Sequence, residues 1–172
     1  GIVVDFVPTT GDLSKYRLVI APSLFLLSDE TALHLSTYVA DGGHLFLGCM
    51  SGVVDRDNAV HLGGYPGGLR EVLGIRVEEF HPLAVGEHVE LAQIGRAWAD
   101  AGAVLPLTRV ASPGAGRGMA AGASSAASPK NGDPAVLRGA LWSEDLRVEG
   151  ARTVATYRGG VLDGRSAITR NT

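Results

Sequence analysis

Cys49, the only cysteine in this chain of 172 residues, is the most obvious candidate for a nucleophile. It lies between Gly48 and Gly52, and small residues of this kind flank the nucleophile in a tight strand-to-helix turn. In such a turn the nucleophile occupies the position midway between the two glycines, which here is Met50. A thioether cannot attack a carbonyl carbon. We therefore predict that Cys49 is a small buried side chain, and we keep a nucleophilic role for it as an alternative.

Carboxylates and histidines define no better catalytic or metal centre. Glu78 and Glu79 are adjacent on an expected strand, so their side chains point to opposite faces. They cannot flank a glycosidic bond, which needs two carboxyl groups about 5 to 9.5 Å apart. The segment from Asp55 to Asn58 resembles a calcium loop but lacks its glycine and its closing glutamate. The histidines have no spacing typical of metal ligands; they are His34, His44, His61, His81 and His88. We predict no catalytic residue, no metal and no cofactor in this chain.

The polar loop from Asp55 to Tyr65 is where we expect function. It follows the apolar run from His44 to Gly48, which is short enough to be a buried strand. A loop at the carboxyl end of a strand is the usual place for a site in an open α/β sheet, and this loop is too long and polar to be a mere connector. The alternative is a structured loop whose carboxylates cap its own backbone. The candidate contact residues are Asp55, Asp57, His61 and Tyr65.

Short apolar strands and helices alternate around this loop. We expect strands at Ile2–Val7, Arg17–Ala21, His44–Gly48 and Ile75–Leu83. We expect helices from the N-cap Ser28 to Asp41 and from Leu69 to Leu73. This alternation predicts a parallel α/β sheet in a single domain spanning residues 1–172. Later short strands are expected at His88–Leu91, Leu141–Trp142, Arg152–Tyr157 and Ser166–Thr169.

The segment from Ala111 to Pro134 differs from the rest, because it consists largely of Gly, Ala, Ser and Pro. Such a composition cannot bury enough apolar surface to offset the entropy of ordering, so we predict a mobile surface loop. The whole chain is 45% hydrophobic and 19% charged, as is usual for a globular domain. Its net charge of −3 gives no electrostatic reason to expect binding to nucleic acid or to an anionic membrane.

The sequence also gives expectations about location and extent. The longest apolar run, from Leu18 to Leu27, is far shorter than the about 20 residues of a membrane span, and no signal peptide is visible. A single cysteine is compatible with a reducing cytoplasm, where we expect the protein. The chain begins without Met inside an expected strand. We therefore expect a piece of a longer protein.

Several motifs in a fixed order resemble the middle domain of the glycoside hydrolase family 42 β-galactosidases, a bacterial family. The resemblance covers roughly residues 1–110 and 138–172. The matching stretches are Val4–Pro8, Tyr16–Pro22, Ser51–Asp55, Val60–Gly67, Leu69–Gly74, Val77–Leu83 and Leu141–Glu144.

This resemblance implies a flavodoxin-like or class I glutamine amidotransferase-like α/β fold without amidotransferase chemistry, which assembles as a homotrimer. It also implies that the sheet is incomplete at both ends, because domains of that family have a further strand and helix before Gly1 and a further strand after Thr172. It also implies a parent enzyme that hydrolyses terminal β-D-galactosides with retention, through carboxylates in a (β/α)₈ barrel outside this chain. The Asp55–Tyr65 loop would then meet a neighbouring subunit, near the mouth of that barrel. Two alternatives remain open: a glutamine amidotransferase-like hydrolase that uses Cys49, and an α/β module that binds a small molecule.

Overall fold

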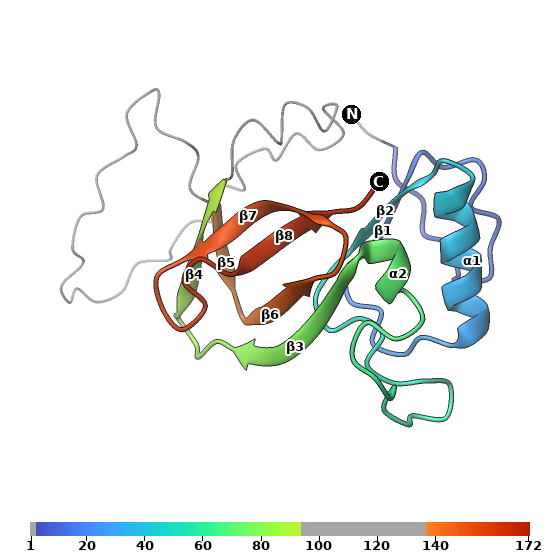
Figure 1. Ribbon diagram of the computed structural model, residues 1–172. Coiled ribbons are helices and arrows are strands. Elements are labelled where there is room, and N and C mark those ends of the chain that lie inside the picture. Colours follow the sequence, from blue (N-terminus) through green and yellow to red (C-terminus); the bar gives the residue numbers. More distant parts are fainter. Residues whose placement is uncertain (1–2, 94–136) are drawn as a thin grey trace, which may run out of the picture.

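The computed structural model describes residues 3–93 and 137–172, in which a small parallel sheet lies beside a larger antiparallel one (Figure 1). The small sheet pairs β1 (Leu18–Ala21) with β2 (His44–Leu47), and helix α1 (Asp29–Ala40) connects the two strands. The larger sheet has the strand order β3-β6-β8-β7-β4-β5. Its strands are β3 (Ile75–Pro82), β4 (His88–Gln93), β5 (Leu137–Ala140), β6 (Trp142–Val148), β7 (Arg152–Arg158) and β8 (Ser166–Arg170).

Helix α1 begins where the sequence predicts. The side chain of Ser28 accepts a hydrogen bond of 3.2 Å from the backbone N–H of Thr31, which is the usual N-cap interaction. Asp29 and Glu30 occupy the first turn, where the helix dipole favours negative charge. Gly43 follows the helix, and a Cβ there would lie 2.2 Å from the Tyr38 ring. The close approach of strand to helix therefore requires glycine at this position.

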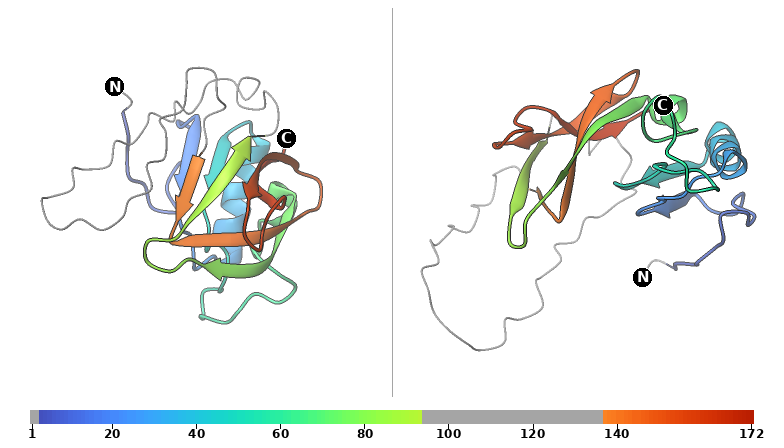
Figure 2. Two further views of the ribbon diagram at one scale, coloured as in Figure 1. Left: turned by 90° about the vertical axis from the view of Figure 1, so that its left-hand side faces the viewer. Right: turned by 90° about the horizontal axis from the view of Figure 1, so that it is seen from below.

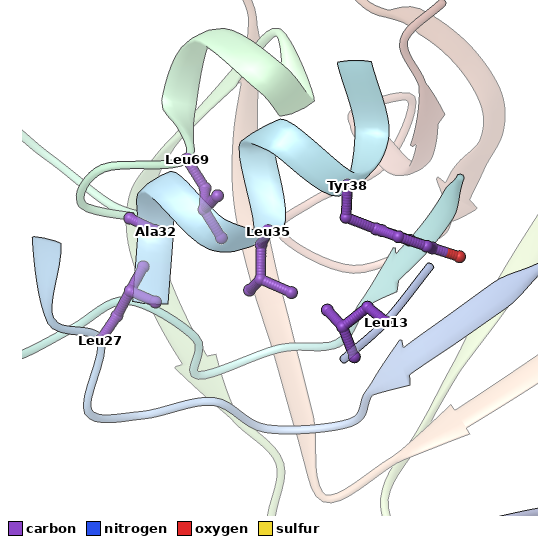
Figure 3. Close-up of a cluster of buried hydrophobic side chains, with 6 residues drawn as sticks. All are labelled: Leu13, Leu27, Ala32, Leu35, Tyr38 and Leu69. Atoms are coloured by element: carbon purple, nitrogen blue, oxygen red, sulfur yellow. The ribbon is translucent and has the colours of Figure 1, made fainter. Parts of the chain in front are cut away.

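The apolar core lies between α1 and the segments that surround it (Figure 3). Leu27, just before α1, and Leu69, just before the short helix α2 (Arg70–Leu73), are both fully buried. Since Leu69 follows the Asp55–Tyr65 loop, the chain is anchored in the core just after that loop. The buried members of this core are Leu13, Leu27, Ala32, Leu35, Tyr38 and Leu69.

A tight connection links α2 to the antiparallel sheet. Gly74 ends α2 in the left-handed region at φ 62°, which glycine adopts at little cost. Its carbonyl oxygen accepts hydrogen bonds from the N–H groups of Glu149 and Ala151, beyond the far end of β6. Strand β3 then pairs with β6 from Ile75↔Val148 to Pro82↔Trp142, with a bulge between Val77 and Glu79. This pairing fixes the edge strand of the sheet that lies nearest to the loop (Figures 1 and 2).

The predicted fold class is wrong for the described residues. We predicted a parallel, flavodoxin-like or class I glutamine amidotransferase-like α/β sheet, whereas among the strands described β1 and β2 alone pair in parallel and six strands form an antiparallel sheet. The strand predicted at Ile2–Val7 is also wrong, because residues 3–7 belong to no strand and Phe6 is fully exposed. The local pattern shows that a run is strand-like but not which strand it pairs with, since pairing is set by long-range packing.

The other predicted elements around the loop are confirmed. Strand β1, helix α1, strand β2, helix α2 and strand β3 all lie within one or two residues of the expected bounds. The closing strands near Trp142, Arg152 and Ser166 are confirmed as well, although they are antiparallel. Strand β5 was not predicted. The predicted mobile loop at Ala111–Pro134 lies outside the described residues.

Candidate functional site

The tip of the Asp55–Tyr65 loop is built around the carboxylate of Asp55. Its Oδ1 accepts hydrogen bonds from the backbone N–H groups of Asp57, at 2.8 Å, and of Ala59, at 2.9 Å. These two bonds lower the pKa of the Asp55 carboxyl group below its ordinary value. Asn58 adopts a positive φ of 60°, which asparagine tolerates better than most residues. The tip is therefore a structured Asx turn, as in the alternative interpretation of this loop.

His61 turns from the loop towards the domain core. Its Nε2 donates a hydrogen bond of 3.0 Å to the carbonyl oxygen of Leu27, and its backbone N–H donates to Val53. The ring lies against Gly67, where a Cβ would be only 2.2 Å from the imidazole Cγ. The side chain of His61 thus connects the second half of the loop, through a hydrogen bond, to the segment before α1.

Tyr65 lies against the antiparallel sheet. Its ring stacks on Phe80 of β3 with a centroid distance of 5.1 Å, and Phe80 in turn lies 5.5 Å from Trp142 of β6. Its carbonyl oxygen accepts a hydrogen bond of 2.8 Å from the N–H of Val77. Tyr65 is half-buried by these contacts. Part of its ring is therefore engaged within the domain.

The four residues predicted for this loop do not meet at one point. Asp55 and the exposed Asp57 form the turn at the tip, His61 points to the core, and Tyr65 packs on β3. The loop has no convergent set of side chains that would bind a small ligand. Its shape is instead that of a preorganised projection, which Figure 1 shows extending beyond α2 and β3.

A second polar cluster was missed from the sequence. The Oε1 atom of Glu144 accepts hydrogen bonds from the backbone N–H of Met50, at 2.8 Å, and from Nε1 of Trp142, at 3.2 Å. The N–H of Glu144 donates to the hydroxyl of Tyr157 at 3.1 Å. Burial raises the pKa of the Glu144 carboxyl group. The available signal was the motif Leu141–Glu144, which pointed to the family but not to a contact with Met50.

Met50 has a positive φ of 58°, an uncommon conformation for a residue other than glycine. The turn after β2 is therefore centred on Met50, as its spacing from the flanking glycines predicts. Cys49 is exposed, so the prediction of a buried side chain is wrong. Desolvation of the thiol and the nearby Glu144 carboxylate raise the pKa of Cys49. A nucleophilic cysteine needs the opposite shift, because the thiolate is the attacking species.

Within residues 3–93 and 137–172, no group of three or more His, Cys, Asp or Glu side chains is arranged to hold a metal ion. The helices in this described part of the chain are too short to cross a membrane.

Comparison with known proteins decides the family. The whole chain, residues 1–172, matches the family model described as the beta-galactosidase trimerisation domain. This chain belongs to that family. The resemblance to the middle domain of glycoside hydrolase family 42 enzymes is thereby confirmed.

Individual relatives agree with the family model. The chain is 34% identical over 170 residues to Beta-galactosidase BgaB from Geobacillus sp., covering 99% of this chain and 20% of the relative. It is 30% identical over 170 residues to a beta-galactosidase from Arthrobacter sp., covering 99% of this chain and 18% of the relative. The chain thus spans about a fifth of the length of the curated relatives that it matches.

Solved structures show the same relationship. A beta-galactosidase from Rahnella sp. superimposes with a TM-score of 0.73 at 27% identity, over 98% of this chain and 20% of that one. A beta-galactosidase from Bacillus circulans gives a TM-score of 0.70 at 27% identity, over 95% of this chain and 19% of that one. The described domain therefore corresponds to one part of each of these larger proteins.

Proposed function

We propose that this domain is a non-catalytic assembly module of a longer β-galactosidase, which forms a homotrimer. The observation that carries the proposal is the full-length match to a trimerisation domain, combined with relatives of which the chain spans about a fifth. The parent enzyme would hydrolyse terminal β-D-galactosides through a separate catalytic domain of the same polypeptide, a (β/α)₈ barrel. The names of the relatives support this substrate class.

The carboxylates of the described residues support a non-catalytic role. Glu78 lies 3.6 Å from the guanidinium of Arg76 and 3.8 Å from that of Arg147, as expected of a surface ion pair. Glu144 is engaged by Met50 and Trp142 within the domain. Neither arrangement resembles two carboxyl groups that face each other across a substrate.

The proposal includes an assembly role for the Asp55–Tyr65 loop. Asp55, Asp57, His61 and Tyr65 would lie at or beside the contact with a neighbouring subunit. The internal hydrogen bonds of Asp55 and His61 support this, because a loop already fixed in shape loses little entropy on binding. We further propose a bacterial source, since Geobacillus and Arthrobacter provide the relatives above, and a cytoplasmic location, which the single cysteine permits.

Light scattering and activity assays of the full-length parent test this function. We expect a trimer that hydrolyses a chromogenic galactoside, with activity unchanged by Cys49→Ala. The 172-residue chain alone should turn over neither that galactoside nor glutamine. Glutamine hydrolysis that disappears in Cys49→Ala would overturn the proposal in favour of an amidotransferase-like hydrolase. Galactoside hydrolysis by the isolated chain would overturn the assignment of catalysis to another domain.

A further inference from the structure

The Asp55–Tyr65 loop exposes two large apolar side chains, although two of its polar side chains bond to the backbone. Its polar side chains at Asp55 and His61 bond to backbone groups of the domain itself. Two apolar side chains lie outside: Val60 is 54% exposed and Leu62 is 98% exposed. Since strand-like residues alternate between two sides, the inward position of His61 accounts for the outward positions of Val60 and Leu62.

Val60 lies in a row with two residues from other segments of the chain. Val54 is bridged to Val60 in antiparallel fashion and to Leu26 in parallel fashion, so these three residues lie side by side. The bonds from Asp55 N–H to Ala59 and from His61 N–H to Val53 flank the Val54–Val60 pair. This pair is therefore of the non-hydrogen-bonded type, in which side chains approach closely.

The exposure of these residues is consistent with Val54 lying between the other two. Val54 in the middle is only 6% exposed, whereas Leu26 on one side is 44% exposed and Val60 on the other is 54% exposed. Leu62 lies two residues after Val60 along the same segment and is the most exposed of the three. We call Leu26, Val60 and Leu62 the Leu62 ridge. Single exposed apolar residues are ordinary, but several gathered on one projection are typical of an interaction site.

We propose that the Leu62 ridge docks onto a second copy of this protein in the assembled trimer, with Leu62 as the central anchor. This inference rests on the proposed function, which supplies the trimer. A closed threefold ring is built from heterologous contacts, in which a patch on one subunit meets a different patch on the next. A projecting apolar ridge suits such a contact, because it can insert into a separate receiving surface.

The position of the ridge favours another subunit over a covalently joined domain. The loop lies at the opposite end of the domain from the C-terminus and from the first described residues (Figure 1, and the left view of Figure 2). Any segment joined to the domain there is attached on the side away from the ridge. A separate copy can approach the ridge without that constraint.

The decisive experiment compares Leu62→Asp with Val161→Asp in the full-length parent by light scattering over a range of micromolar concentrations. Val161 is the matched control, because it is 85% exposed and lies in the turn between β7 and β8. We expect Leu62→Asp to weaken association about thirtyfold, as the loss of an interface anchor typically does, and Val161→Asp to leave the trimer intact. Leu62→Asn, which introduces no charge, should weaken association in the same direction.

A photocrosslinking amino acid at position 62 identifies the occupant directly. Irradiation of the parent should give covalent species of two or more subunits. Crosslinking confined to single polypeptides would identify another domain of the same chain as the occupant and would overturn the inference. So would a trimer that is unaffected by both Leu62 variants, although the proposed function would then survive. A parent that is monomeric before any substitution would overturn the inference and the proposed trimer together.

Discussion

Glu144 of β6 and Met50, which lies 94 residues earlier, are joined by a hydrogen bond of 2.8 Å from the Met50 N–H to the Glu144 carboxylate. The bond links the turn after β2 to the antiparallel sheet. It also satisfies a backbone donor at a residue with a positive φ of 58°. A long-range bond to a left-handed residue is well suited to hold that residue in an uncommon conformation.

The first prediction concerns the charge of Glu144. Burial raises the pKa of this carboxyl group above its ordinary value of 4.5, so the folded protein binds the proton more tightly than the unfolded chain does. The contribution of Glu144 to the free energy of unfolding must therefore fall as the pH rises from 4.5 through the raised pKa. We expect Glu144→Gln to lack this fall. Urea unfolding of both proteins on either side of that window measures the difference.

A second substitution at this position serves as the control. Glu144→Ala removes the acceptor for the N–H of Met50 and for the indole of Trp142, so we expect it to lower the free energy of unfolding by about 1–3 kcal/mol at neutral pH. Glu144→Gln retains an acceptor oxygen and should lose less. An identical pH dependence in wild type and Glu144→Gln would show that another group is responsible for it.

The second prediction concerns Tyr65. Because its ring stacks on Phe80 within the domain, we expect Tyr65→Ala to lower the free energy of unfolding by about 2 kcal/mol, less than for a fully buried aromatic residue. Tyr65→Phe keeps the stacked ring and should stay close to wild type. Urea unfolding of the chain measures both. Wild-type stability in Tyr65→Ala, accompanied by loss of the trimer in the parent, would instead assign the ring wholly to a subunit contact.

Much of the local structure could be predicted from the sequence because it depends on neighbours in the chain. Ser28 marks the start of α1, and the glycines on either side of the turn identify Met50 as its centre. The sheet topology could not be predicted in this way. An apolar run such as Ile75–Pro82 has the same composition whether its neighbour is parallel or antiparallel, and its partners in β6 lie sixty or more residues later in the chain.

The candidate site shows the same limit. Composition identified the polar loop, and the capping role of Asp55 follows from local chain geometry. The inward orientation of His61 depends on a hydrogen bond to Leu27, which lies 34 residues away in the sequence. It also depends on Gly67, which contacts the His61 ring only in the folded chain. Exposure of Leu62 could not be foreseen either, since a leucine in a loop is as compatible with a core position.

The third prediction tests the turn at Asp55. Because its carboxylate accepts from two backbone N–H groups, we expect Asp55→Ala to accelerate hydrogen exchange at Asp57 and Ala59 by at least tenfold, while Asp55→Asn retains an acceptor and protects them. Asp57→Ala is the matched control, since the hydrogen bond uses only the backbone of that residue. Mass spectrometry of the loop peptide measures the exchange.

The stabilisation by Asp55 depends on pH with the opposite sign to the contribution of Glu144 to the free energy of unfolding. The pKa of Asp55 is lowered in the folded protein, so its contribution is present above the ordinary value of 3.8 and is lost as the pH falls through the lowered pKa. Protection factors at Ala59 should therefore be constant at neutral pH and should decline under strongly acidic conditions. Equal protection in Asp55→Ala and wild type would show that the backbone alone holds the turn.

The fourth prediction separates packing from hydrogen bonding at His61. Gly67 has no positive φ, so alanine is compatible with its backbone, but the added Cβ would lie 2.2 Å from the imidazole ring. We expect Gly67→Ala to displace His61 from Leu27 and to lower the free energy of unfolding by about 1–3 kcal/mol. In a His61→Ala background the obstacle is absent, so the same change should cost less than about 0.5 kcal/mol. Urea unfolding of the four proteins of this double-mutant cycle gives the coupling. Equal costs in both backgrounds would mean that the backbone at Gly67, and not the His61 ring, requires glycine.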